Sequence, residues 1–112
     1  MENHRISQDQ LREMADQIAK WKEDHKNVIL VSLADDPIDI ICKVPNPDDV
    51  KVANRLADNM DKNRQLVLSC LLYPKLDVFN AILEEKAGIV VPIADRLIKE
   101  YGAAQDTTAK KL

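Results

Sequence analysis

Two short segments rich in β-branched side chains flank an acidic turn, and they constrain the fold more than any other feature. The first segment, VILVSLA at residues 28–34, is too short and too β-branched for an ordinary helix, and Asp35-Asp36-Pro37 follows it as a turn. Beyond the turn, side chains alternate with the period of two that is typical of a half-buried strand. One face of that strand carries Ile38, Ile40, Cys42 and Val44, and the other carries Asp39, Ile41 and Lys43. The pattern predicts a β-hairpin.

A hairpin of two strands is only marginally stable in water, so this one requires helices across its apolar face or strands from another chain. The chain has 112 residues, enough for one domain, and its 46% hydrophobic content includes only 4% aromatic residues. A core of aliphatic side chains is usual where helices dominate. We therefore expect one globular domain at residues 1–102, with a mostly α, α+β fold in which the small β-hairpin packs against four to five helices. Residues 103–112 are expected to form a flexible C-terminal tail.

Capping residues mark the starts of two helices. Ser7 and Gln10 have the spacing of a capping box, which predicts a first helix over about residues 8–25. Asn46 followed by Pro47 predicts a second start, because Asn caps well and Pro fits the first helical position. Each helix carries an apolar stripe at 3-4 spacing. The stripes consist of Leu11, Met14, Ala15, Ile18 and Trp21 in the first helix, and Val50, Ala53, Leu56, Ala57 and Met60 in the second.

Three further helices are expected downstream. Residues 66–72 (LVLSCLL) are almost entirely apolar and end close to a proline, which predicts a buried central helix. Residues 75–87 and 89–101 return to an amphipathic rhythm. Gly88 and Gly102 follow these two segments and are predicted to close them in the left-handed conformation.

The two cysteines, Cys42 and Cys70, could serve as nucleophiles if either lay beside His4 or His25, because a thiolate needs a neighbouring base or cation. Both cysteines instead lie in apolar patterns, where cysteine behaves as a small hydrophobic residue. We assign no catalytic residue. A small cysteine- or metal-dependent enzyme stays as an alternative function, and exposure of a cysteine near a histidine would favour it.

No metal or cofactor site is predicted. Asp35, Asp36 and Asp39 gather near the hairpin turn, but their spacing matches no calcium loop. Gly88 and Gly102 are the two glycines of the chain, and both follow predicted helices. The sequence therefore contains no glycine-rich motif of a phosphate-binding loop.

The charge balance disfavours a nucleic-acid partner. The chain holds 16 Lys+Arg against 19 Asp+Glu, a net charge of -3, so it offers no basic excess to neutralise phosphates. Residues 66–86 could form a helix-turn-helix, which makes a DNA-binding regulator the second alternative, but its second helix offers only Lys75 and Lys86 as bases. No apolar run reaches the roughly 20 residues of a membrane span, and residues 1–7 lack the apolar core of a signal peptide. We expect a cytoplasmic protein with no membrane partner.

The segments between residues 63 and 102 follow a distinctive order: NRQLVLSCLLYP, then a helix ending EEKAG, then an apolar helix ending RLIKEYG. With the short strand pair and the Lys43-Val44-Pro45 step upstream, this order resembles the phage or prophage tail assembly chaperone family. The resemblance covers about residues 27–102. The matching positions other than generic apolar ones are Cys70, Tyr73-Pro74 and Gly88.

The resemblance implies a non-enzymatic role in the cytoplasm of a bacterial host cell. Members of the family coat the tape measure protein and help tail tube subunits assemble around it. The implied partners are therefore the tape measure protein, the tail tube protein and a second copy of the chain in a homo-oligomer. Surplus apolar surface and an open hairpin edge suit this role, because a long helical client has apolar stripes that must be shielded.

The apolar arc of the last helix is broader than packing requires, which favours a partner-binding surface there. The predicted contact residues are Ile89, Val91, Ile93, Leu97 and Tyr101. An ordinary core helix is the alternative interpretation of the same arc. If Ile93 faces a partner, Ile93→Asp should weaken capture of a helical client while the fold survives.

Overall fold

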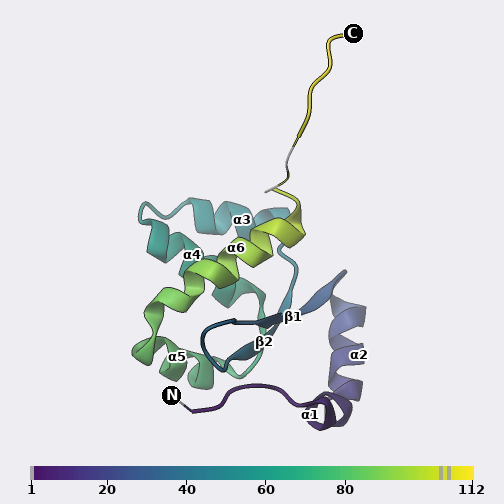
Figure 1. Cartoon of the computed structure of the whole chain (residues 1–112), viewed down its shortest axis with the longest axis vertical. Helices are drawn as coiled ribbons and strands as arrows, with labels where there is room; N and C mark the ends of the chain where they lie inside the picture. Colours follow the sequence, from purple (N-terminus) through teal and green to yellow (C-terminus); the bar gives the residue numbers. More distant parts are fainter. Residues whose placement is uncertain (1, 104, 106) are drawn as a thin grey trace.

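A three-stranded antiparallel sheet lies at the centre of the fold, with helices on both sides of it (Figure 1). Its strands are β1 (Val28–Ser32), β2 (Asp39–Lys43) and β3 (Leu71–Tyr73), and β2 is the central strand. The computed structural model describes residues 2–103, 105 and 107–112. Helices contain far more of these residues than strands do, so the predicted mostly α, α+β fold is confirmed.

The predicted hairpin is present. β1 and β2 pair antiparallel, with Leu30 directly opposite Ile41. The turn between them is tied to the helices by an ion pair, in which Lys86 Nζ lies 2.7 Å from Asp36 Oδ1. Asp36 therefore has two roles: it is part of the turn, and it holds the turn against the helices.

The register of the strands assigns each side chain to one of the two faces of the sheet. Successive residues of a strand point to opposite faces, and residues paired across an antiparallel sheet point to the same face. The first face carries Ile29, Val31, Ile40 and Cys42, and the second face carries Val28, Leu30, Asp39 and Ile41. The prediction that β2 is half-buried was wrong. Asp39 is only 7% exposed and Ile41 only 3%, because the N-terminal segment lies over the second face.

The N-terminal segment, residues 2–24, starts as an extended arm and continues as α1 (Gln8–Glu13) and α2 (Ala15–Asp24). The predicted capping box is confirmed: Gln10 N–H donates to Ser7 Oγ (3.1 Å), and Ser7 N–H donates to Gln10 Oε1 (2.7 Å). The single helix predicted here is broken in two, which gives the described chain six α-helices. Neither α1 nor α2 contains a buried residue.

A layer of helices packs against the first face of the sheet. It consists of α3 (Pro47–Asn54), α4 (Asn59–Cys70), α5 (Leu76–Glu85), the short 3-10 helix η1 (Ala87–Ile89) and α6 (Val90–Tyr101). Asn46 caps α3 as predicted, accepting from Asp49 N–H at 2.9 Å. Gly102 closes α6 with a φ of 94°, which confirms the left-handed cap. The same prediction for Gly88 was wrong, because Lys86 ends α5 with a negative φ and Gly88 continues into η1.

The central helix predicted at residues 66–72 was wrong at its C-terminal end. The chain leaves α4 at Leu71 in an extended conformation and forms β3. There Leu71 pairs with Cys42 and Tyr73 with Ile41. Pro74 disfavours helix in the residue before it, and the unpaired edge of β2 supplies backbone partners. Because this strand separates α4 from α5, residues 66–86 do not form a helix-turn-helix.

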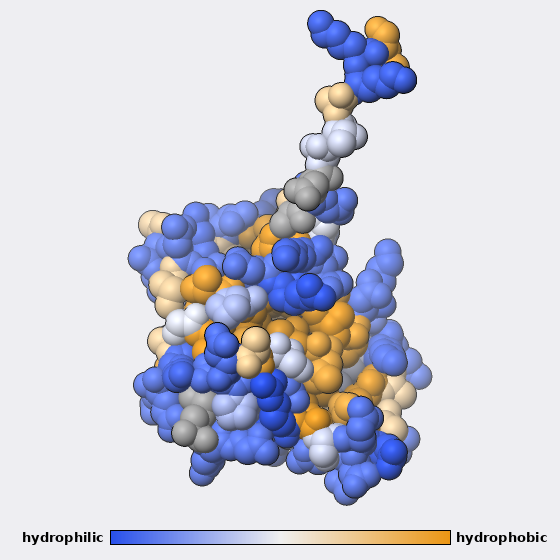
Figure 2. All heavy atoms as spheres, viewed as in Figure 1, coloured by the Kyte–Doolittle hydropathy of each residue, from blue (hydrophilic) through white to orange (hydrophobic). Residues whose placement is uncertain are grey.

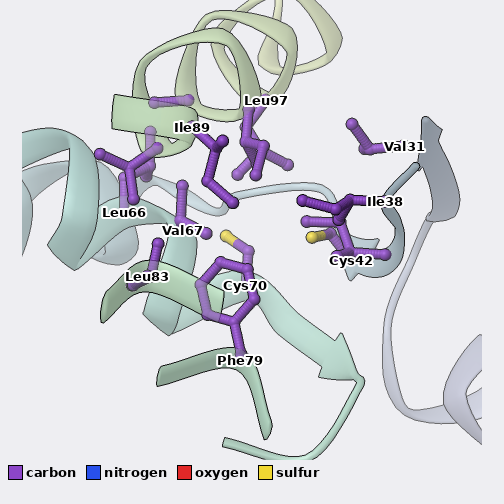
Figure 3. Packing of buried hydrophobic residues seen from close by; sticks show 14 of the residues in the cluster. Val31, Ile38, Cys42, Leu66, Val67, Cys70, Phe79, Leu83, Ile89 and Leu97 are labelled. Carbon is purple, nitrogen blue, oxygen red and sulfur yellow. The ribbon is translucent and has the colours of Figure 1, made fainter. Parts of the chain in front are cut away.

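The core lies between the first face of the sheet and the layer of helices (Figure 3). The sheet contributes Val31, Ile38, Ile40 and Cys42. The helices contribute Ala53, Leu66, Val67, Cys70, Phe79, Ile82, Leu83, Ile89, Val90, Ile93, Ala94 and Leu97. Phe79 is the one aromatic side chain among them, as expected from the low aromatic content.

The tail predicted at residues 103–112 includes residues 104 and 106, which lie outside the described residues. The described tail residues form neither helix nor strand. They extend away from the domain in Figure 1. A second domain could be joined at this end without touching the packed helices.

Candidate functional site

The partner-binding residues predicted on α6 are mostly core residues. Ile93 and Leu97 are both 0% exposed, and Ile89 is also buried. Val91 is exposed and Tyr101 is half-buried. The broad apolar arc of α6 is filled by its own domain, because this helix packs on α4 and its buried side chains belong to the same core cluster as those of the sheet. The assignment of Ile89, Ile93 and Leu97 to an open contact surface was therefore wrong.

Both cysteines are fully buried. Burial raises the pKa of Cys42 and of Cys70 to about 12, because the thiolate loses its hydration inside the protein. The reactive form of cysteine is the thiolate, and neither side chain is exposed beside a histidine. The observation that would favour a cysteine-dependent enzyme is therefore missing. Within the described ranges, no three His, Cys, Asp or Glu side chains gather to hold a metal ion.

The open apolar surface lies elsewhere, along β1. A groove of about 170 Å³ separates this strand from α1 and α2. We name it the edge groove, and it is lined by Leu11, Ile18, Lys22, Val28, Ile29, Leu30 and Ile41. Figure 2 shows apolar side chains gathered over β1, between α6 and α2. All but one of the lining residues are apolar, so the edge groove is the candidate functional site.

The sequence builds the edge groove from two patterns. Alternation along β1 sends Val28 and Leu30 to the second face, and the helical spacing of α1 and α2 directs Leu11 and Ile18 toward the same place. Leu30 remains 46% exposed, although it is a large apolar residue in a strand. Exposed apolar surface that is contiguous and bordered by polar residues is typical of a protein-binding site.

β1 is also an edge strand. It pairs only with β2, and no strand of the described chain lies on its other side. Leu33 N–H donates to the Ile38 carbonyl and Val44 N–H donates to the Asn27 carbonyl, so the odd-numbered residues of β1 face β2. The backbone groups of Val28, Leu30 and Ser32 therefore point to the open edge.

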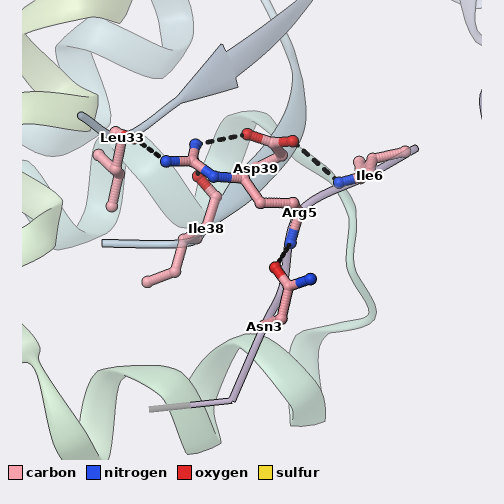
Figure 4. Close-up of polar contacts among 6 residues, drawn as sticks. All are labelled: Asn3, Arg5, Ile6, Leu33, Ile38 and Asp39. Carbon is pink, nitrogen blue, oxygen red and sulfur yellow. Dashed lines mark hydrogen bonds and ion pairs between the residues drawn. The ribbon is translucent and has the colours of Figure 1, made fainter. Parts of the chain in front are cut away.

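One buried carboxylate anchors the N-terminal arm beside the edge groove (Figure 4). Asp39 Oδ1 lies 2.9 Å from Arg5 Nη1, and Asp39 Oδ2 accepts from Ile6 N–H at 2.9 Å. The Arg5 guanidinium also donates to the Leu33 carbonyl at 2.6 Å. His4 adds a strand-like bridge at the edge of β2 away from β1, since Asp39 N–H donates to the His4 carbonyl (3.1 Å). Sequence reasoning missed this anchor, because nothing in the local pattern connects Arg5 with Asp39.

Acid should release the arm. Burial is the strongest influence and raises the pKa of Asp39, but hydrogen bonds from Ile6 N–H, the Ser32 hydroxyl and Arg5 together outweigh it, so the pKa lies below its ordinary value. A carboxyl group whose pKa is lower in the folded form than in the unfolded form stabilises the folded form when it is ionised. This stabilisation is complete above the unfolded pKa of about 3.9 and is lost as the pH falls through the folded pKa. Emission of Trp21, the one tryptophan and a residue of α2, should therefore shift to the red below about pH 4. A red shift of equal size in the Asp39→Asn variant would contradict the assignment of this change to protonation of Asp39.

A larger hollow of about 480 Å³ opens between α4 and α5. Its lining mixes apolar and charged side chains: Met60, Asp61, Arg64, Asn80, Leu83, Glu84, Ala87 and Val90. Asn80 Oδ1 is buried there without a hydrogen-bond partner. Charges of both signs share the lining, so this hollow indicates no single class of ligand.

Comparison with known proteins adds information on the fold. No family model and no curated protein matches the chain. A solved structure, that of the uncharacterised protein rbstp2171 from Bacillus stearothermophilus, is similar, with a TM-score of 0.71 at 18% sequence identity. The match covers 83% of this chain and 99% of that chain. At this identity the likeness shows a shared fold alone. No helix of the described residues is long and apolar enough to cross a membrane.

Proposed function

We propose that the protein is a non-enzymatic binding protein that shields an amphipathic helix of another protein, in the manner of a tail assembly chaperone. The observation that carries the proposal is the edge groove, whose lining is apolar except for Lys22. It lies over a sheet face that already accommodates α1 and α2, so a helix is an occupant of suitable shape. The client proposed is the helical tape measure protein, with the tail tube protein as its partner in assembly.

The shielding role needs a surface that binds apolar stripes without requiring one exact sequence. The edge groove offers Leu and Ile side chains, which adapt to many apolar partners, and few polar groups that would demand a matched hydrogen bond. Affinity for each site on a long client can then be modest. Many copies of a small protein along one client would cover its apolar surface together.

Leu30→Asp should weaken binding to a purified helical segment of the tape measure protein from the same genome by about tenfold or more, because an unpaired carboxylate would enter an apolar contact. The fold should survive, since Leu30 is already half exposed. Isothermal titration calorimetry measures the affinity. The control is Leu76→Asp, which places the same charge at another exposed leucine, on α5 and outside the edge groove. Equal losses in both variants, or no binding by the wild type, would reject the proposal.

A further inference from the structure

The N-terminal segment is held over the sheet by few contacts. Among the described residues, every hydrogen bond and ion pair that joins it to the hairpin comes from His4, Arg5 or Ile6, and α1 and α2 contribute none. Neither helix has a buried residue, and the edge groove remains beneath them. Parts of a fold with few buried apolar contacts open at a lower free energy than the core.

A hinge lies at the C-terminal end of the segment. Asn27 is already fixed to the sheet, because its carbonyl accepts from Val44 N–H at 3.0 Å. α2 ends at Asp24, and His25 is extended with φ -129° and ψ 143°. Rotation at His25 and Lys26 would therefore move α1 and α2 as a unit while β1 stays paired with β2.

Opening at this hinge would uncover the second face of the sheet. Ile41, now almost fully buried, would become accessible together with Val28 and Leu30. The chain itself shows what covers this face: an amphipathic helical segment with Leu11 and Ile18 on the side toward the sheet. A partner of the same chemistry, a helix with apolar residues at 3-4 spacing, would bury the same side chains.

We propose that the N-terminal segment is an internal placeholder for a partner helix. It opens about residues 25 and 26 while the rest of the domain stays folded, and an amphipathic helix of another protein takes its place on the second face of the sheet. This proposal rests on the proposed function, and it adds where the client helix binds and what controls access to that face. A tethered segment acts at an effective concentration in the millimolar range, so it excludes weak partners and yields only to a tighter helix.

Hydrogen exchange measured by mass spectrometry on the full chain tests the opening. Amides of α1 and α2 should exchange at least a hundredfold faster than those of α4 and α6. Arg5→Ala removes the anchor at Asp39 and should speed exchange in α1 and α2 by about a further tenfold, with α4 and α6 unchanged. The matched control is Arg12→Ala, which removes an ion pair with Asp9 that lies wholly within α1 and is exposed. Equal protection of the N-terminal segment and the core, or a uniform effect of Arg5→Ala, would overturn the proposal.

A peptide with the sequence of residues 8–25 tests the docking site, because it contains α1 and α2, the helices that lie over this face in the folded chain. Added to the full chain, the labelled peptide should bind Arg5→Ala about tenfold more tightly than the wild type, since a larger open fraction lowers the apparent Kd in proportion. The same peptide carrying Ile18→Asp should not bind. Fluorescence anisotropy reports both affinities.

The outcomes separate this proposal from the proposed function. Fast exchange of α1 and α2 without peptide binding would overturn the docking site, while binding of the tape measure segment in the edge groove with α1 and α2 still in place, tested by Leu30→Asp, could still stand. Conversely, peptide binding that Arg5→Ala strengthens would support the placeholder even if the tape measure segment does not bind. Dimers of Arg5→Ala formed by exchange of N-terminal segments, detected by light scattering, would assign the face to a second copy and overturn the foreign helix as its occupant.

Discussion

Replacing Ile93 with Asp should leave the protein largely unfolded at 25 °C. Ile93 has no exposed surface, and it lies on α6 within the core between that helix, α4 and the sheet. An ionised carboxylate without a partner is destabilised there by several kcal/mol, which is comparable with the roughly 5–15 kcal/mol that separates folded from unfolded domains. Far-UV circular dichroism and thermal unfolding measure the effect.

The control for this substitution is Val91→Asp on the same helix. Val91 is 38% exposed, so its carboxylate would be hydrated and the fold should be retained. Comparing the two variants separates burial of charge from an effect on the helix itself. A folded Ile93→Asp variant would mean that this side of α6 opens to a partner after all, as the sequence suggested.

Phe79→Ala should lower the free energy of unfolding by about 3–5 kcal/mol. Phe79 is the largest of the fully buried side chains, and its ring lies beside Cys70 in Figure 3. Truncation removes apolar contacts and leaves a cavity that α4 and α5 cannot close without moving. Urea denaturation followed by circular dichroism gives the difference. Val78→Ala, next in the chain but exposed, should change the free energy by less than about 1 kcal/mol. A similar loss in both variants would show that the ring is not part of the core.

Local patterns predicted the parts of the fold that neighbouring residues decide. The hairpin, the capping box at Ser7 and the caps at Asn46 and Gly102 each depend on residues a few positions apart. β3 could not be found in this way, because three residues carry no periodicity and their conformation depends on the free edge of β2, about thirty positions upstream.

The site was harder to predict than the fold. A broad apolar arc on α6 is equally compatible with a core and with an interface, because both require the same side chains. Asp39 was assigned to an open face since strands often alternate in this way, yet its carboxylate is buried against Arg5 of the N-terminal arm, 34 residues upstream. The open edge of the hairpin was predicted as a binding surface, but the edge groove itself was not, because its lining comes from three segments that only the folded chain brings together.

The position of the N-terminal segment in the chain has a consequence for biosynthesis. An edge strand with outward-pointing backbone groups and an exposed leucine is a template on which other nascent chains can stack. Translation delivers α1 and α2 from the ribosome before β1 and β2, so the cover exists before the surface that needs it. The second face of the hairpin can therefore be covered while the helices of its first face are still being made, whereas the outward backbone groups of β1 stay open throughout.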